Sequence, residues 1–274
     1  SSIAYILRKD SFFADEWITY YGSQFGYDNL YLFVDGMDQK LPSLSKKINC
    51  FQVPHIEYKR AKGDRKRAQH ISKFAQELFQ NYQLVLAMDI DEFLVLDPNQ
   101  KCSLKAYLSQ EFNSSSLSAL GLDVGQHPSL EQPIDLKKPF LSQRAYAQVS
   151  DRYTKPIVAL RPLNWGSGFH RVKEKNYTID SNLFLFHFGL VDYEYAKKNT
   201  QNNQLLSSGW KGHFDRRFQL YSNIETQKPH EADAFFKKAR VLLSRRRKWF
   251  AWNKPAPLKG TALVRIPERF KTLV

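Results

Sequence analysis

The chain has 274 residues, with 41 Lys or Arg against 27 Asp or Glu, and a formal net charge of +14. No window approaches eighteen uninterrupted apolar residues and the opening SSIAYILRKD lacks the ordered regions of a signal peptide, so we expect no membrane-spanning helix and no leader. Cys50 and Cys102 lie far apart without metal-ligand spacing, as reduced thiols of a cytoplasmic protein do. The positive charge predicts an acidic partner: nucleic acid, an anionic membrane surface, or a phosphorylated sugar donor or acceptor.

Short apolar runs alternate with helical patterns in the first third of the chain. Strands are predicted at residues 3–8, 29–35 and 48–53, and helices at 11–25 and 64–82. Strand–helix–strand repetition predicts an α/β fold with a parallel sheet and right-handed crossovers. Ligands of such sheets gather at the carboxyl ends of the strands, so polar side chains there are candidate site residues.

Residues 84–96, LVLAMDIDEFLVL, place Asp89, Asp91 and Glu92 inside an apolar run. Because burying unpaired carboxylates is costly, this pattern predicts a buried parallel strand whose carboxyl end opens at a crevice. Alternate residues of a strand point the same way, so Asp89 and Asp91 would face one cation while Glu92 faces away. Carboxylate oxygens suit Mg²⁺ or Mn²⁺, especially when substrate phosphates complete the coordination. The alternative is a helix cap or a solvated turn after a core strand.

The middle of the chain is less regular. Strands are predicted at residues 117–127, 157–160 and 183–188, and a helix at 191–206. The Pro-containing stretch 128–156 between them is expected to form loops that shape a binding cleft.

Two basic clusters account for much of the net charge. The first, residues 59–67, follows a predicted strand, and within it Arg65 and Lys66 are candidates for binding a diphosphate. The second lies in a predicted helix at 231–252, where residues 235–252 mix aromatic and cationic side chains as helices at a membrane interface do. We therefore consider contact with an anionic membrane surface. For both clusters the alternative is a solvated helix face.

Three segments in order resemble family 2-like glycosyltransferases. They are the opening AYILRKDSFFADEWITYYGSQFGYDNLYLFVDGMD, the strand MDIDEFLVL, and TKPIVALRPLNWGSGFHRV followed by LFLFHF. The resemblance covers about residues 3–195 and implies a GT-A-type, Rossmann-like and mostly parallel sheet flanked by helices. It also implies a nucleotide-sugar donor, Mn²⁺ or Mg²⁺, and usually inversion at the anomeric carbon.

The resemblance also suggests how the chain is organised. Residues 1–208 would form the glycosyltransferase domain, with a donor half at about 1–97 and an acceptor half at about 98–208. Residues 209–274 would then form a basic, helical C-terminal extension.

The resemblance assigns donor-side roles to particular residues. Asp91 would bind the metal, and Asp89 would contact the donor ribose or reach the metal through water. His187 matches a late histidine that reaches the metal or the diphosphate, although a hydrogen-bonded structural histidine is the alternative. Asp35 and Asp38 stand where the family holds the nucleotide base and ribose.

Asp10 is a further donor contact, although Lys9-Asp10 stands where Asn-Glu is commoner in the family. An inverting transfer also needs a base to accept the proton of the acceptor hydroxyl. Asp123 is the first choice, with Asp192 or Glu194 as alternatives, and a turn cap is the competing role for Asp123.

Three residues are predicted to contact the acceptor. His127 follows Asp123 on the same loop, and His170 lies in the Gly-containing segment WGSGFHR. Trp165 in that segment could stack on a sugar face, or could anchor a packed loop.

Other functional classes fit less well. A DxD phosphatase of the haloacid-dehalogenase type has Thr or Val two residues after the second Asp, where this chain has Phe93. A nucleic-acid-binding protein would explain the charge, but the chain has no RNP-like stretch, zinc-finger spacing or evident helix-turn-helix. The sequence therefore predicts a metal-dependent glycosyltransferase acting on a glycan or lipid-linked acceptor. Surface polysaccharide synthesis in bacteria is a plausible setting, with the protein peripheral on the inner face of the membrane.

Overall fold

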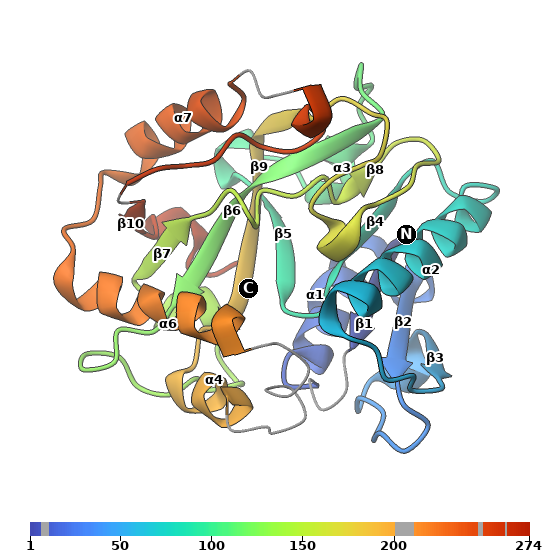
Figure 1. The fold of residues 1–274 in the computed structure, drawn as a ribbon, viewed down its shortest axis with the longest axis horizontal. Helices are drawn as coiled ribbons and strands as arrows, with labels where there is room; N and C mark the ends of the chain where they lie inside the picture. Colours follow the sequence, from blue (N-terminus) through green and yellow to red (C-terminus); the bar gives the residue numbers. More distant parts are fainter. Residues whose placement is uncertain (7–10, 201–210, 246–248, 261) are drawn as a thin grey trace.

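The computed structural model describes residues 1–6, 11–200, 211–245, 249–260 and 262–274. These residues form an α/β fold in which a ten-stranded mixed sheet is flanked by helices (Figure 1). Parallel strands make up one part of the sheet, and a largely antiparallel set makes up the other.

The parallel part contains the first four strands. These are β1 (Ser2–Ile6), β2 (Leu30–Asp35), β3 (Asn49–Val53) and β4 (Val85–Asp89). They pair in the order β3-β2-β1-β4, and every pairing among them is parallel. The strand–helix alternation predicted from the sequence is confirmed for this part of the chain.

Helix α1 (Ala14–Phe25) and helix α2 (Arg60–Leu78) cover opposite faces of these strands. Alternation along the strands divides the apolar side chains between the helices. On β2, Leu32 packs in the cluster with α1, while Phe33 packs in the cluster with α2. Both ends of each helix lie within about four residues of their predicted positions. The agreement arises because the helical spacing of apolar residues marks the buried face of each helix.

The second part of the sheet contains β6 (Ser116–Gly125), β7 (Tyr146–Val149), β8 (Val158–Ala159), β9 (Ile179–Leu190) and β10 (Leu263–Arg265). Only β6 and β9 pair in parallel here, whereas β8 runs antiparallel to both β4 and β6. The predicted mostly parallel sheet is therefore wrong for this part. The connections from β6 to β7 and from β7 to β8 contain no α-helical crossover, and loop connections favour antiparallel neighbours.

The acidic segment forms two strands where the sequence predicts one. Strand β4 ends at Asp89, residues 90 and 91 form a turn, and β5 (Glu92–Leu96) leaves to pair antiparallel with β9. The alternation rule does not apply across this turn, so Asp89 and Asp91 do not share a strand face.

The remaining helices are α3 (Leu104–Leu108), α4 (Tyr193–Thr200), α6 (Lys211–Thr226) and α7 (Ala232–Leu243). Helix α7 ends well before the end of the helix predicted at 231–252. Short 3-10 turns link the other elements at Tyr27–Asn29, Ser45–Lys47, Pro98–Gln100, Phe140–Gln143, Ser167–Phe169, Trp249–Ala251 and Glu268–Phe270.

The predicted domain boundary between residues 208 and 209 lies in 201–210, outside the described residues. Strand β10 joins the same sheet by pairing with β7, and Phe235 and Phe236 of α7 are buried in the main hydrophobic core. The division into a domain and an extension stays a prediction. Within the described part of the chain, no helix is long and apolar enough to cross a bilayer.

Candidate functional site

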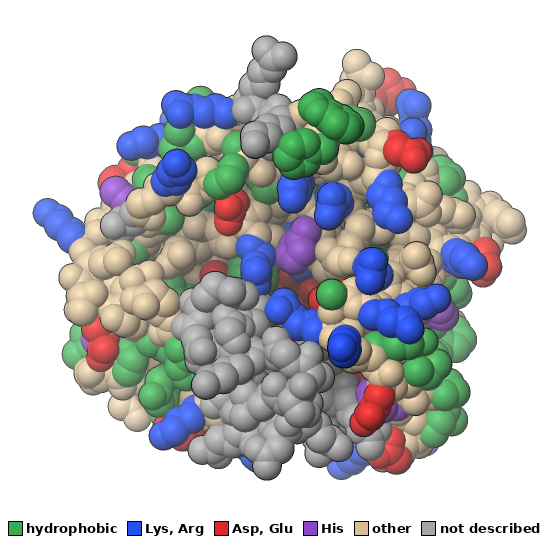
Figure 2. All heavy atoms as spheres, in the orientation of Figure 1, with side chains coloured by type: hydrophobic (Ala, Val, Ile, Leu, Met, Phe, Trp, Pro, Cys, Tyr) green, Lys and Arg blue, Asp and Glu red, His purple; other side chains and the backbone are tan. Residues whose placement is uncertain are grey.

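The turn between β4 and β5 places three acidic side chains in different surroundings. Asp89 and Asp91 are partly exposed, whereas Glu92 is fully buried. Lys and Arg side chains gather around the centre of the molecular face shown in Figure 2, with acidic and histidine side chains between them.

Asp91 is joined to a histidine and a second aspartate. Its Oδ2 lies 3.1 Å from His187 Nε2, and His187 Nδ1 lies 2.6 Å from Asp123 Oδ1. The strand register explains the alignment, because His187 on β9 is paired with Asp123 on β6 and with Glu92 on β5. The backbone N–H of Phe188 donates to the Asp91 carbonyl at 2.9 Å, which holds the turn against β9.

The two carboxylates determine the charge of His187. Burial alone would lower the pKa of the imidazole, but Asp91 and Asp123 outweigh it and raise the pKa to about 9. The ring of Tyr153 stacks on the imidazole, with centroids 3.7 Å apart and planes 17° apart. His187 is therefore a fixed, buried imidazolium at neutral pH in the metal-free protein.

Asp89 belongs to a separate cluster built around a buried lysine. Lys155 Nζ lies 2.9 Å from Asp89 Oδ2 and 2.5 Å from Glu92 Oε1. The other Glu92 oxygen accepts the backbone N–H of Asp89 at 3.1 Å. Arg67 of α2 approaches from the opposite side, with Nη2 at 3.4 Å from Asp89 Oδ1 and at 3.4 Å from Asp64 Oδ1.

Fixed cations compensate the charge of Asp89. Burial would raise its pKa, but Lys155 and Arg67 together hold that pKa well below its usual range. Burial and the neighbouring Asp89 raise the pKa of Glu92, and both carboxylates raise the pKa of Lys155 against the effect of its burial. Unlike Asp91, Asp89 is paired with cations that do not titrate near neutral pH.

A glycine in β6 lets the loop that carries Lys155 lie against the strand. A Cβ at Gly121 would stand 2.2 Å from the carbonyl carbon of Tyr153 and 2.4 Å from the nitrogen of Thr154. Instead the Gly121 N–H donates to Thr154 Oγ1 at 3.0 Å. This close approach positions Tyr153 over His187 and Lys155 between the two acids.

His170, which is predicted from the sequence to contact the acceptor, lies close enough to the Asp89 cluster to interact with the charges of Lys155 and Asp89. Its Nδ1 lies 2.9 Å from the carbonyl oxygen of Arg152, so Nδ1 carries the proton and Nε2 keeps a lone pair. Burial and the charge of Lys155 lower the pKa of His170 to about 3, which keeps the ring neutral. The preceding Phe169 is buried at a positive φ of 58°, a strained conformation for a bulky residue.

The carboxyl ends of β1 and β2 bring further polar groups to this edge. Asp35 ends β2, and its Oδ2 lies 3.0 Å from His55 Nδ1. Burial, followed by the charge of Asp35, raises the pKa of Tyr5 on β1 to about 12. The guanidinium of Arg67 lies 6.0 Å from the centre of the Tyr5 ring. Tyr5, Asp35 and Arg67 thus border the Asp89 cluster.

The basic residues chosen from the sequence do not reach this site. Arg65 and Lys66 are exposed on α2, and Arg65 Nε donates to the carbonyl of Ala61 in its own helix. Arg67, the next residue, lies four residues before the buried Ile71 and therefore on the buried side of the helix. From that side it reaches Asp89. The helix presents its cation to the site at position 67.

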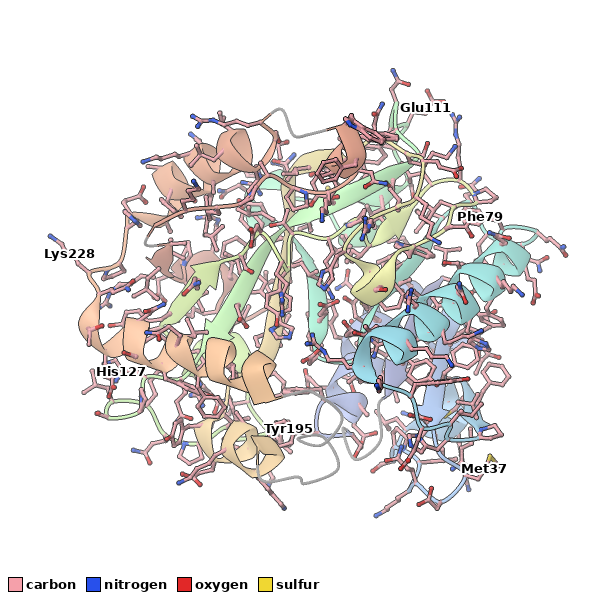
Figure 3. The ribbon with its side chains drawn as sticks, viewed as in Figure 1. Met37, Phe79, Glu111, His127, Tyr195 and Lys228 are labelled. Carbon is pink, nitrogen blue, oxygen red and sulfur yellow. The ribbon has the colours of Figure 1, made fainter. Side chains whose placement is uncertain are left out.

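Two donor-side predictions have different outcomes. Asp38 is exposed in the turn after β2, beside Met37, which Figure 3 labels at the lower right edge of the molecule. It lies three residues beyond Asp35, which ends the strand. Asp10 lies outside the described residues.

Two of the three predicted acceptor residues lie elsewhere. Trp165 is buried in the cluster beneath α2, and its indole N–H donates to the Pro156 carbonyl at 2.8 Å. This is the packed anchor, not a platform for a sugar. His127 follows β6, its N–H donates to Glu131 Oε2, and Figure 3 labels it at the left edge of the molecule, on the side opposite α2.

Two of the three residues proposed as catalytic base, Asp123 and Asp192, hold other groups in place. Asp123 stands behind His187 and fixes its Nδ1, so the geometry favours a positioning role for it. Asp192 accepts the backbone N–H groups of Ile134 and Tyr195, the second of these as a cap of α4. Glu194 is exposed on α4.

The separation of the paired Asp91 and His187 atoms is that of an ion pair and also fits two neighbouring metal ligands. Ligands about 2.1 Å from Mg²⁺ or Mn²⁺ at right angles are separated by about 3.0 Å, and the Asp91 and His187 ligand atoms lie 3.1 Å apart. A carboxylate on the second nitrogen, as Asp123 provides, is the usual support of a metal-bound histidine. Asp89 does not complete this site, because its oxygens face Lys155 and Arg67; its predicted role as a metal ligand is therefore revised.

Within the described residues there is no group of three or more His, Cys, Asp or Glu side chains that could hold a metal ion. Two protein ligands suit a divalent cation that takes its other ligands from water and substrate phosphates.

Sequence reasoning did not identify Lys155, Arg67 or Tyr153 as site residues. Each is buried or nearly buried at the β4–β5 turn, and each contacts one of the acidic side chains or His187. The sequence matches no model of a known protein family, and a search of curated proteins found no match.

Proposed function

We propose that this protein is a metal-dependent glycosyltransferase that moves a sugar from a nucleotide-sugar donor to a glycan or lipid-linked acceptor. The observation that carries the proposal is the line of Asp91, His187 and Asp123, in which two ligand atoms lie 3.1 Å apart and the third side chain fixes the histidine. A GT-A arrangement is part of the proposal, supported by the parallel order β3-β2-β1-β4 that ends at this site.

The chemistry of transfer requires the departing nucleoside diphosphate to be stabilised. A divalent cation held by Asp91 and His187 would supply positive charge to the diphosphate when bound. Asp123 keeps the proton of His187 on Nδ1, which leaves Nε2 available as a ligand atom. Arg67 lies 6.0 Å from the centre of the Tyr5 ring and 3.4 Å from Asp89 Oδ1, and it would add fixed positive charge beside the diphosphate.

Groups on the two sides of Asp89 suit the two substrates. Tyr5 and Asp35, at the ends of β1 and β2, offer an aromatic ring and a carboxylate for the nucleoside. His170 offers a neutral Nε2 that can accept a hydrogen bond from a sugar hydroxyl. Trp165 and His127 have no part in this proposal, since Trp165 is buried beneath α2 and His127 follows β6.

The proposal is tested by the release of nucleoside diphosphate from a panel of UDP-, GDP-, ADP- and CDP-sugars. The protein is first treated with EDTA, and then assayed with Mn²⁺, with Mg²⁺ and without metal. The variants Asp91→Asn and His187→Gln remove one ligand each. Glu111→Gln is the matched control, because Glu111 is exposed at the upper edge of the molecule in Figure 3.

We expect one donor to be cleaved only with metal, with a loss of about a hundredfold or more in both ligand variants and none in the control. Metal-independent cleavage, or a fully active Asp91→Asn protein, would contradict the proposal. Failure of every donor to turn over or to bind under all metal conditions would also reject it.

A further inference from the structure

A turn of exposed aromatic residues follows α7. Trp249 is 84% exposed and Phe250 is 60% exposed, with their rings edge to face at 5.9 Å. Trp252 completes the group as a third exposed ring. Large apolar side chains grouped on the surface mark an interaction site more often than isolated ones do.

The structure holds this turn in place. Asn253 is buried, and its Nδ2 donates to the carbonyl of Val172 at 2.7 Å. The N–H of Ala256 donates to the Leu243 carbonyl at 2.8 Å, which closes the segment against the end of α7. The aromatic rings are thus presented to solvent by a segment anchored at its C-terminal side.

Exposed cations precede the turn, on the outer face of α7 and just beyond its end. Lys237, Lys238 and Val241 of α7 are exposed, and so is Arg245, two residues beyond the end of the helix. The inner face carries Phe235, Phe236, Ala239 and Leu243, which are buried in the core. The predicted interfacial helix at 235–252 is therefore revised, because the apolar face of α7 is packed in the core, whereas the rings of the turn after it are exposed.

The turn borders the face that carries the candidate site. Val172, which accepts the bond from Asn253, is two residues beyond His170 in the same loop. In Figure 2, hydrophobic side chains gather at the upper edge of the face, and Lys and Arg side chains lie between them and its centre. In the same orientation, Figure 1 shows the turn at the top of the molecule.

We propose that the aromatic turn Trp249–Trp252 and the exposed cations of α7 form a docking surface for an anionic lipid bilayer. Trp and Phe rings favour the boundary between headgroups and acyl chains, and nearby Lys and Arg are attracted to anionic headgroups. Charge complementarity selects the bilayer as occupant, since exposed cations precede the exposed rings in this segment. Docking in this orientation places the site next to the membrane, where it would meet a lipid-linked acceptor; only this last consequence rests on the proposed function.

Sedimentation with vesicles tests the docking surface directly. Phosphatidylcholine vesicles, alone or mixed with phosphatidylglycerol, are compared at low and high salt. We expect binding to the mixed vesicles at low salt and weaker binding at high salt. Trp249→Ser combined with Phe250→Ser should weaken the binding at least about tenfold. Lys237→Glu combined with Lys238→Glu should weaken it at low salt and leave little further salt dependence.

The matched control removes two exposed apolar side chains from another surface. Leu130→Ser combined with Leu136→Ser alters residues that are 73% and 54% exposed, and should leave vesicle binding unchanged. Circular dichroism and thermal unfolding of every variant show that it is folded. As a second readout, lipids with brominated acyl chains should quench Trp fluorescence of the wild type, and less that of Trp249→Phe combined with Trp252→Phe.

Absence of binding to anionic vesicles at low salt would overturn the proposal, as would equal loss in the control variant. Self-association that is abolished by the aromatic substitutions, without vesicle binding, would assign the surface to a second copy of the chain. The experiment needs no nucleotide sugar, and we expect Asp91→Asn to bind vesicles normally. Failure of docking is therefore distinguishable from failure of the proposed transferase activity.

Discussion

Asp89 and Asp91 are two residues apart in one motif, yet they belong to opposite kinds of electrostatic environment. Asp89 faces Lys155 and Arg67, whose charges persist throughout the physiological pH range. Asp91 faces His187, whose positive charge is lost when a proton leaves or a metal takes its place. The turn at residues 90 and 91 separates the two environments.

The two acids of the motif therefore have different roles, one structural and one in the candidate site. The carboxylate of Asp89, compensated by buried permanent cations, is a structural anchor, and the carboxylate of Glu92 fixes its backbone by accepting the Asp89 N–H. The carboxylate of Asp91 is compensated by a titratable imidazole, and at such a pair a cation can take the place of the proton. The substitutions and pH changes that follow should affect the two clusters differently.

The largest effect is expected from Lys155→Met, which removes the cation shared by Asp89 and Glu92. Removing one partner of a buried ion pair leaves an uncompensated charge and costs about 3–5 kcal/mol of unfolding free energy. Burial already raises the folded-state pKa of Glu92 above its unfolded value, and loss of the Lys155 charge would raise it further. The contribution of Glu92 to the unfolding free energy is therefore retained at low pH and lost as pH rises. The loss of unfolding free energy in the variant should then be larger at pH 8 than at pH 5.

Urea unfolding of wild type and variant at the two pH values measures this deficit. Lys138→Met is the control, because the ion pair between Lys138 and Asp135 is exposed and such pairs contribute about 0–1 kcal/mol. Equal losses in the two variants would show that the Lys155 cluster does not stabilise the fold.

The second effect concerns the pH dependence of stability in EDTA, where His187 is free of metal. Its folded pKa of about 9 is above the unfolded value of 6.5, so its contribution is complete below pH 6.5 and is lost as pH rises to 9. The difference corresponds to about 3 kcal/mol. Chemical unfolding at pH 6.5 and 9 should show this fall in the wild type and a much smaller fall in His187→Gln. The same fall in both proteins would remove His187 from the explanation.

A smaller effect is expected from Gly121→Ala, which links the two clusters through the loop that carries Tyr153 and Lys155. The added Cβ would meet backbone atoms at 2.2 and 2.4 Å, and forced repacking of this kind costs about 1–3 kcal/mol. Thermal unfolding should report the loss.

Gly63→Ala in α2 is the matched control. A Cβ there meets only Tyr58 Cβ at 3.6 Å, and alanine favours a helix by up to about 1 kcal/mol. We expect this variant to be as stable as the wild type or more so. Destabilisation of both variants to the same degree would mean that the close approach at Gly121 has no special role.

The first four strands and the two helices between them were predictable because their apolar spacing differs from that of the loops. The direction of later strands was not, because buried strands show similar apolar runs whether their neighbours are parallel or antiparallel. The turn at Ile90 and Asp91 contains neither Gly nor Pro, so it gave no signal against a continuous strand.

The site was partly predictable. The resemblance selected Asp91 and His187, and the need for a catalytic base selected Asp123. The structure brings these three together, although with Asp123 behind the histidine. Arg67 could have been identified, because it lies four residues before Ile71 and so follows the buried stripe of α2. Lys155 could not, because its role depends on a loop packed against β6 and on contacts far apart in the sequence.

The central claim is that Asp91 and His187 form a site for a divalent cation and a diphosphate. Thermal unfolding with UDP, GDP, ADP or CDP, each with and without Mn²⁺, tests it most directly in the wild type and in Asp91→Asn. A ligand at a hundred times its dissociation constant stabilises the folded state by about 2.7 kcal/mol. We expect one nucleotide to stabilise the wild type only with Mn²⁺, and no such stabilisation of Asp91→Asn. Stabilisation that is equal without metal, or that persists in Asp91→Asn, would contradict the claim.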